Sequence, residues 1–126
     1  MNVHLDHTVI NSTHRFEAAR FLTGLLGAAD PEVNGPFAAV RLEGGVTLDY
    51  ADHIVPAREI VQQHFCFRVT DEHFDEIFAR VQERGLEYWA DPYHRTPGEI
   101  NHLAGGRGFY VLDPDGHNLE FLTRTH

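Results

Sequence analysis

Two histidines and one glutamate in the sequence have the chemistry to bind a divalent metal together. His7 and His64 each lie in a β-rich segment, and each precedes a threonine, Thr13 or Thr70, by six residues. Glu120 lies in the last apolar segment of the chain. Two neutral imidazole nitrogens and one carboxylate oxygen suit Fe(II), Mn(II), Zn(II), Ni(II) or Co(II), and they leave coordination positions open for a substrate.

The first half of the chain is predicted to fold as a strand, a helix and two further strands. Its elements are a strand over 3–10, a helix capped by Asn11, Ser12 or Thr13, a loop over 31–36, and strands over 37–42 and 46–51. The helix has apolar residues at the spacing of one helical face and ends at Gly27, a residue type that commonly follows a helix. Gly44 and Gly45 predict the hairpin turn between the two strands.

The second half is predicted to repeat this order. Its elements are a strand over 64–69, a helix capped by Thr70 or Asp71, a short strand over 86–89, a polar loop over 90–107, and a hairpin over 108–112 and 118–123. Apolar residues between Phe74 and Val81 fit the i, i+3, i+4, i+7 spacing of a helix. Asp-Pro-Asp-Gly at 113–116 suits a type I turn.

The spacing of the two halves predicts an internal repeat. His7 precedes Gly27 by 20 residues, and His64 precedes Gly85 by 21. The sequence therefore predicts an α+β fold of two βαβββ modules, about 1–58 and about 59–126, within a single domain of 126 residues. Side by side, two such modules form a half-closed, barrel-like cup with the helices outside.

Alternation along the strands predicts which side chains line this cup. The phenylalanines at 65 and 67 are expected to face the helix, so His64 and Cys66 face the cup. By the same rule Glu120 faces the cup from the last strand and His7 from the first. Cys66 is expected to be a small interior residue, because no helix N-terminus adjoins it to activate the thiol.

Three segments resemble the vicinal oxygen chelate superfamily, which contains glyoxalases, bleomycin-resistance proteins and extradiol dioxygenases. They are Leu5-Asp6-His7-Thr8-Val9, His64-Phe65-Cys66-Phe67-Arg68-Val69 and Gly108-Phe-Tyr-Val-Leu-Asp-Pro-Asp-Gly-His-Asn-Leu-Glu120-Phe. The resemblance covers nearly the whole chain in the right order. It implies that His7, His64 and Glu120 are the metal ligands. It also implies a homodimer with the site near or across the subunit interface.

Further residues are expected at the site. In glyoxalase-like members a carboxylate on the strand matching 46–51 is a fourth ligand; Asp49 is a candidate, but it is shorter than the usual glutamate, which favours three ligands. The other candidates are Tyr110 and His102 for catalysis, with Glu120, and Arg41, Arg68, Tyr93 and Trp89 for substrate binding. The loop over 90–107 is a candidate lid.

The favoured function is a metal-dependent, glyoxalase- or dioxygenase-like enzyme whose small substrate chelates the metal through vicinal oxygens. One alternative is a metal-free protein of the bleomycin-resistance type that sequesters an aromatic antibiotic among Phe37, Tyr50, Trp89, Tyr93 and Tyr110. Another is a fosfomycin-modifying thiol transferase, whose closing motif also carries Phe-Tyr. Those transferases rely on additional cationic groups, and this chain has no lysine.

The amino-acid composition limits the classes of partner that the protein is expected to bind. The net charge of −9 opposes binding to nucleic acid or anionic membranes. No apolar run is long enough to span a bilayer, and the single cysteine excludes an internal disulfide. These features predict a cytoplasmic protein that binds small molecules.

Overall fold

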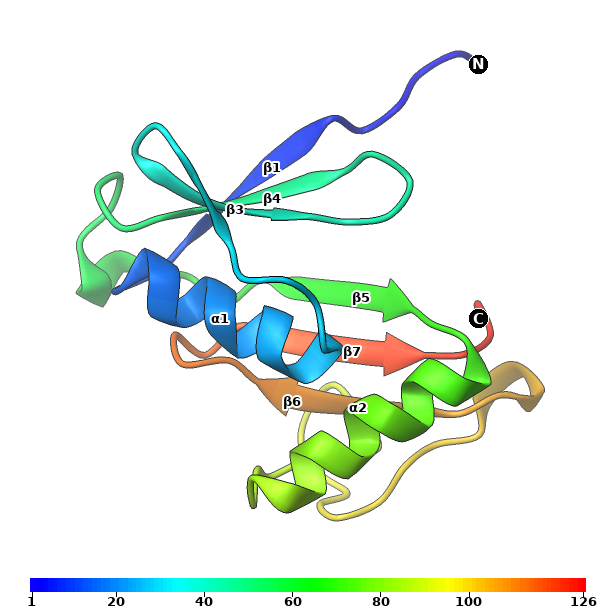
Figure 1. The fold of residues 1–126 in the computed structure, drawn as a ribbon. Helices are drawn as coiled ribbons and strands as arrows, with labels where there is room; N and C mark the ends of the chain where they lie inside the picture. Colours follow the sequence, from blue (N-terminus) through cyan, green and yellow to red (C-terminus); the bar gives the residue numbers. More distant parts are fainter. The chain divides into compact units, whose positions relative to one another are not determined.

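The computed structural model describes residues 1–126 as two units, Met1–Ile60 and Val61–His126. Each unit contains one β-sheet and one long α-helix, which confirms the predicted α+β class (Figure 1). None of the helices has both the length and the apolar composition required to cross a membrane.

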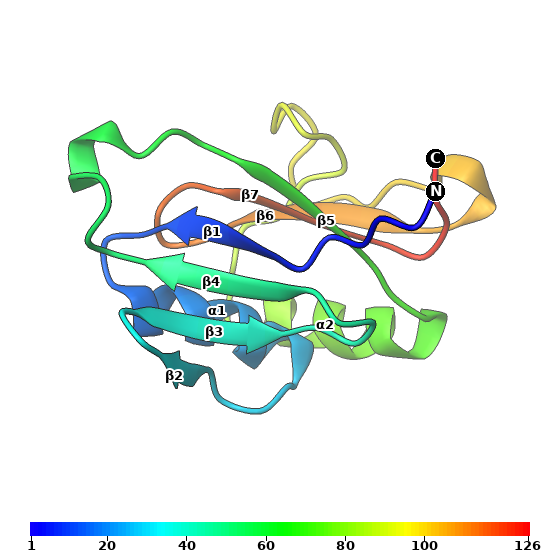
Figure 2. The ribbon, with the colours of Figure 1, turned by 90° about the horizontal axis from the view of Figure 1, so that it is seen from above.

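The first unit is a four-stranded sheet with a helix against one face. Its elements are β1 (His7–Asn11), α1 (Arg15–Leu26), β2 (Glu32–Asn34), β3 (Phe37–Arg41), β4 (Thr47–Ala51) and the short η1 (Ala57–Glu59). The strand order is β1-β4-β3-β2, and β1 pairs with β4 in parallel while the other pairs are antiparallel. Figure 2 shows α1 running beneath the sheet.

The core of the first unit lies between α1 and the sheet. Leu22 and Leu25 of α1 are fully buried. Ile10, Leu48 and Tyr50 of the sheet are at most 4% exposed. Side chains alternate across a strand, so the neighbours of these core residues point to the other face. That other face therefore carries His7, Thr47 and Asp49, whose register the β1–β4 ladder fixes.

The second unit is a three-stranded sheet with a helix on one face. Its elements are β5 (His64–Arg68), α2 (Asp71–Glu83), the short η2 (Leu103–Gly105), β6 (Gly108–Leu112) and β7 (Asn118–Leu122). The strand order is β5-β7-β6, with β5 parallel to β7 and β6 antiparallel to it. Phe74 and Phe78 of α2 each lie 5.3 Å from the ring of Phe109, so the Phe109 face of the sheet is the core face.

Three local features of the structure match those predicted from the sequence. The Thr70 hydroxyl accepts a hydrogen bond from the His73 N–H and caps α2. Gly27 ends α1 in the left-handed conformation with a φ of 69°. The N–H of Gly116 donates to the carbonyl of Asp113, which closes the predicted turn before β7.

Other elements differ from the prediction. The first strand begins at His7 rather than at residue 3, and the loop predicted over 31–36 contains the short edge strand β2. The strand predicted over 86–89 is reduced to a single residue, Trp89, which bridges to Tyr110 and to Pro97. Trp89 keeps only these two isolated bridges, because the chain turns away into the loop directly after it.

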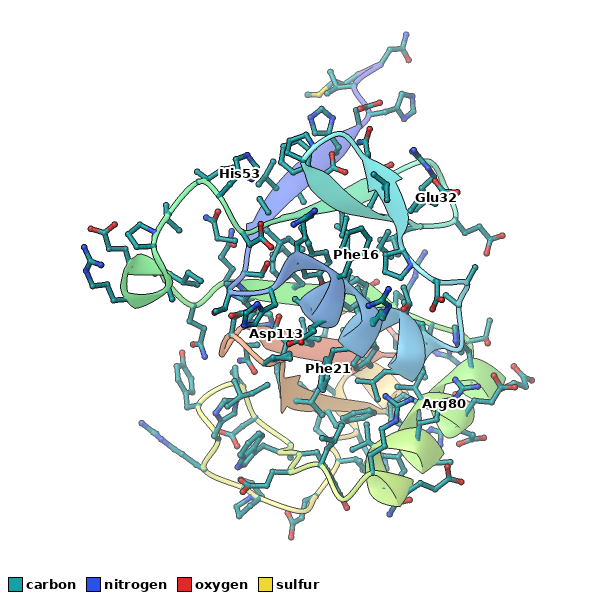
Figure 3. All side chains as sticks on the ribbon, turned by 60° about the vertical axis from the view of Figure 1, so that its left-hand side comes forward. Phe16, Phe21, Glu32, His53, Arg80 and Asp113 are labelled. Atoms are coloured by element: carbon teal, nitrogen blue, oxygen red, sulfur yellow. The ribbon has the colours of Figure 1, made fainter.

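The start of α1 is also capped differently from the prediction. The N-cap of the helix is His14 rather than one of residues 11–13, and the His14 side chain makes no capping bond. Instead, the Asp52 carboxylate accepts the N–H of Arg15 at 3.0 Å and its guanidinium at 3.2 Å. The Arg15 and Arg20 guanidiniums lie over the ring of Phe16, which Figure 3 labels on α1.

This cap predicts a pH-dependent stability. The N–H of Arg15, opposed by desolvation and helped by the Arg15 guanidinium, holds the pKa of Asp52 below its usual value. Asp52→Ala should lower the free energy of unfolding at neutral pH by about 1 kcal/mol, as the loss of a helix cap does. Because folding lowers this pKa, the stabilisation is complete above the ordinary aspartate pKa of about 3.9 and disappears as the pH falls through the folded-state value.

Urea unfolding of both proteins at neutral and at acidic pH measures this effect. The exposed Asp30→Ala variant serves as the control, since it should match the unsubstituted protein at each pH. An equal stability difference between Asp52→Ala and the unsubstituted protein at both pH values would contradict the assignment.

Candidate metal centre

The centre of the second sheet holds a buried carboxylate with a histidine on each oxygen. Glu120 lies in the middle of β7, and its side chain is only 4% exposed. Its Oε1 lies 2.9 Å from Nε2 of His64 on β5. Its Oε2 lies 3.1 Å from Nε2 of His126, in the segment after β7. The strand register puts Cys66 and Tyr110 on either side of Glu120, on the face opposite α2.

The surroundings keep Glu120 ionised. Burial alone would raise the pKa of this carboxyl, but hydrogen bonds from His64, His126, Tyr110 and Cys66 outweigh it and hold the pKa below its usual value. The effect is reciprocal, because burial and then the Glu120 charge raise the pKa of Tyr110 and raise the pKa of Cys66 to about 12. The site therefore combines one carboxylate anion with a protonated phenol and a protonated thiol.

The His64–Glu120 pair has the spacing of two adjacent metal ligands. Metal–nitrogen and metal–oxygen bonds of about 2.1 Å at a right angle separate the two ligand atoms by about 3 Å. The observed separation is 2.9 Å, and a nitrogen and a carboxylate oxygen are donors that first-row divalent metals accept. These two residues therefore fit a divalent metal.

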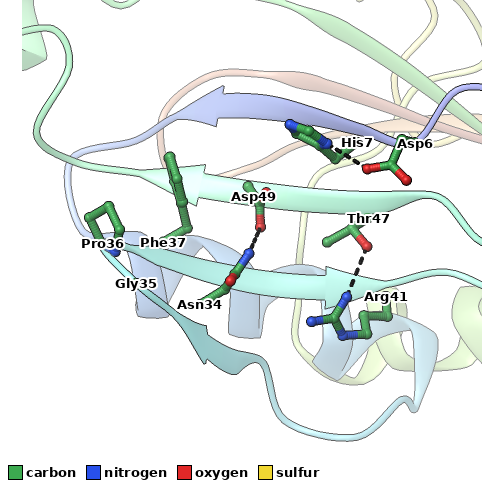
Figure 4. Close-up of a pocket in the computed structure, with 9 residues that line it drawn as sticks. All are labelled: Asp6, His7, Asn34, Gly35, Pro36, Phe37, Arg41, Thr47 and Asp49. Carbon is green, nitrogen blue, oxygen red and sulfur yellow. Dashed lines mark hydrogen bonds and ion pairs between the residues drawn. The ribbon is translucent and has the colours of Figure 1, made fainter.

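His7 lies in the first unit, in a pocket of about 350 Å³ (Figure 4). Its Nδ1 lies 2.7 Å from the Asp6 carboxylate, and this hydrogen bond is the main reason that the pKa of His7 is raised. Metal-binding histidines commonly hold one ring nitrogen on a carboxylate and use the other for the metal. In His7 this leaves Nε2 as the nitrogen for a metal.

The two units repeat the same arrangement of histidine and carboxylate. In the first unit Val9, two residues after His7, pairs in register with Asp49. In the second unit Cys66, two residues after His64, pairs with Glu120. The side chains then differ. Glu120 contacts its histidine, whereas Asp49, 5% exposed, accepts a hydrogen bond from the Asn34 amide at 3.2 Å.

The structure brings together some predicted site residues and not others. Glu120, His64 and Tyr110 form one cluster, in which the His64 and Tyr110 rings are 5.5 Å apart. No group of three or more histidine, cysteine, aspartate or glutamate side chains has the geometry to hold a metal, and His7 is not part of the His64–Glu120 cluster. His102 is exposed at the start of η2.

The predicted substrate-binding residues have varied surroundings. Arg41 lines the His7 pocket but is paired with Glu32 at 2.7 Å. Arg68 donates to the Thr125 hydroxyl at 3.3 Å. Tyr93 is 76% exposed, whereas Trp89 is only 9% exposed.

The loop over 90–107 folds onto the second sheet. Within it the Asp91 carboxylate accepts the N–H groups of Tyr93, Arg95 and Thr96. The His94 ring stacks on Trp89 at 4.0 Å and lies 3.0 Å from Oδ1 of Asn118. The loop is therefore tied to the sheet by specific contacts.

Sequence reasoning missed three residues of these clusters: Asp6, Asn34 and His126. Asp6 adjoins His7 in the sequence and was the one that local reasoning could have found. Asn34 and His126 lie outside the predicted strands, so strand alternation gave no information on them. Two expectations were wrong: Tyr50 is 1% exposed in the core and is not available to a ligand, and Cys66 is exposed as a residue rather than interior, although its thiol lies against Glu120 and is partly desolvated there.

The chain is similar to a described protein family and to several proteins of known structure. A family model described as Glyoxalase/Bleomycin resistance protein/Dioxygenase superfamily matches residues 4–121. A solved structure of "Oxidase ChaP-H1" is 51% identical with a TM-score of 0.92, over 98% of this chain and 97% of that chain. A structure of "Oxidase ChaP-H2" is 50% identical with a TM-score of 0.93, over 100% of this chain and 97% of that chain.

A third relative is a curated protein, "Glutathione transferase FosA" from Serratia marcescens. It is 32% identical over 75 residues, which make up 60% of this chain and 46% of that protein. The match thus spans less than half the length of this relative.

The raised pKa of Cys66, about 12, predicts an unreactive thiol in the metal-free protein. A thiol with an ordinary pKa of about 8.5 has a substantial thiolate fraction at mildly alkaline pH, and only the thiolate is nucleophilic. Disulfide-exchange labelling of native protein should therefore be at least about 10-fold slower than labelling of denatured protein. Glu120→Gln removes the neighbouring charge and should speed up the native reaction; equal rates in native and denatured protein would refute the assignment.

Proposed function

The chain belongs to the Glyoxalase/Bleomycin resistance protein/Dioxygenase superfamily, and we propose that it is a metal-dependent oxidase of a small molecule bearing two neighbouring oxygen atoms. In the simplest balance the substrate loses two electrons and two protons, and dioxygen takes them up as hydrogen peroxide. The observation that carries this proposal is the direct contact of His64 with the buried Glu120 carboxylate, which has the spacing of two metal ligands.

The relatives support a metal-dependent oxidation. Members of this superfamily typically use a divalent metal. The two solved relatives named oxidases are half identical to this chain over nearly all of both chains, which is close enough to suggest a shared reaction type. We therefore favour oxygen-dependent chemistry over isomerase or lyase chemistry.

His7, His64 and Glu120 are the proposed metal ligands, within a homodimer. Bound there, the metal supplies Lewis acidity toward the two substrate oxygens. The hydroxyl of Tyr110 donates its one proton to Glu120, and its oxygen can still accept a hydrogen bond from a substrate hydroxyl. His102 is a candidate proton carrier.

The pocket of the first unit and the loop over 90–107 of the second unit are each candidates for contact with the substrate. Arg41 lines the pocket that contains His7, and its charge is held there by Glu32. Arg68 and the exposed Tyr93 are candidates for contacts with the distal part of the substrate. Trp89, stacked under His94, stiffens the loop that would exclude water.

Two alternatives have less support. A metal-free, antibiotic-binding protein would need an aromatic lining, but Tyr50 is in the core and Trp89 is nearly covered. A thiol transferase is favoured only by the partial match to FosA. Consumption of a thiol rather than of oxygen would identify that activity.

The ligand assignment predicts the metal affinity of three variants. His7→Ala, His64→Ala and Glu120→Ala should each weaken Co(II) binding by at least about 10-fold, because each removes one donor. Circular dichroism should stay native. His4→Ala, which removes a histidine before β1, is the matched control and should bind Co(II) normally. If His64→Ala bound Co(II) as tightly as the unsubstituted protein, the proposed centre would be wrong.

The Asn34–Asp49 hydrogen bond predicts that Asp49 is not a ligand. Asp49→Ala should leave Co(II) affinity within about 3-fold of the original, in contrast to the substitutions above. Three protein ligands leave room for a chelating substrate and dioxygen together. Fe(II)-loaded protein should then consume oxygen with catechol, whose oxygens are adjacent, and not with hydroquinone, whose oxygens cannot chelate one metal.

An oxygen electrode measures both reactions. Equal oxygen uptake with catechol and hydroquinone, or uptake unaffected by His64→Ala, would contradict chelation at the proposed centre. A large loss of Co(II) affinity in Asp49→Ala would show that Asp49 is a fourth ligand and would favour isomerase or lyase chemistry.

A further inference from the structure

His126 contacts the oxygen of Glu120 that His64 does not use. Its Nε2 lies 3.1 Å from Oε2, while Nε2 of His64 lies 2.9 Å from Oε1. A glutamate that binds a metal through one oxygen leaves the other oxygen without that partner. In a side chain only 4% exposed, a charged oxygen without a hydrogen bond is costly.

The segment that carries His126 is held in place by the second unit. Thr123 accepts the N–H of Arg107 through its hydroxyl and donates its own N–H to the Arg107 carbonyl. Arg68 on β5 donates to the Thr125 hydroxyl at 3.3 Å. In Figure 1 this segment turns back beside the ends of β7 and β5. The position of His126 is thus fixed by bonds on both sides of Arg124.

We propose that His126 is a positioning residue of the metal centre, which donates its Nε2–H to Oε2 of Glu120 and so directs Oε1 toward the metal. The inference rests on the proposed function, since it presumes that His64 and Glu120 bind the metal. It adds a residue whose role is to orient a ligand rather than to be one. Ligating carboxylates are commonly held by such hydrogen bonds, and their loss weakens metal binding.

The geometry favours this role over direct ligation. The two imidazoles contact different oxygens of one carboxylate, so a metal shared by His64 and Oε1 leaves His126 free to keep its bond to Oε2. A positioning bond needs only a donor N–H, whereas a ligand needs an imidazole lone pair. Glutamine carries an N–H donor of similar reach, and it separates the two roles.

The experiment is Co(II) titration of the metal-free protein and of His126→Ala and His126→Gln, followed by visible absorption. His126→Ala should bind Co(II) about 10-fold more weakly, and His126→Gln should recover most of the affinity. The Co(II) spectrum should keep its band positions in both variants, because the coordination number does not change. His4→Ala is again the control.

Each other result overturns the inference. Equal losses in both variants with a changed spectrum would make His126 a ligand. Unchanged or tighter binding in His126→Ala would mean that it has no positioning role. The His64→Ala variant separates this failure from a failure of the proposed function. If His64→Ala binds Co(II) normally, the proposed metal centre itself is wrong. If His64→Ala loses Co(II) affinity and the His126 variants do not, only the proposed role of His126 is wrong.

Discussion

The structure of the second unit depends on the need to satisfy one buried charge. Glu120 lies in the central strand of its sheet, where β5 and β6 flank it and solvent reaches almost none of the side chain. A carboxylate in such a position is stable only if its oxygens have donors. His64 and His126 provide two, and Tyr110 and Cys66 lower its pKa further. The same demand makes the carboxylate available to a metal, which can replace a proton as its partner.

The parallel pairing of the first and last strands explains how each unit brings a histidine near a carboxylate. β1 lies beside β4 and β5 beside β7, so the opening histidine of each unit is next to the closing strand. In the second unit the closing strand offers Glu120, which reaches its histidine. In the first unit it offers Asp49, which is one methylene shorter and bound by Asn34. The same strand topology therefore gives a direct histidine–carboxylate contact in the second unit. In the first unit it gives a pocket in which the histidine and the carboxylate do not contact each other.

Periodicity and turn chemistry predicted most of the fold because they are local. The helix from 71 to 83, its Thr70 cap and the turn at 113–116 are all determined by residues near in sequence. The α1 cap was mispredicted, because its acceptor, Asp52, lies 37 residues away from Arg15. The role of His126 depends likewise on contacts between distant segments, and no spacing rule reports them.

We infer that His64 and Glu120 bind a divalent metal through Nε2 and Oε1. Anomalous X-ray scattering from crystals of the Co(II)-loaded protein tests it directly. One strong peak is expected within about 2.2 Å of both atoms, with His126 still bonded to Oε2. A Co(II) peak that lies away from both atoms, or protein that takes up no Co(II), would contradict it.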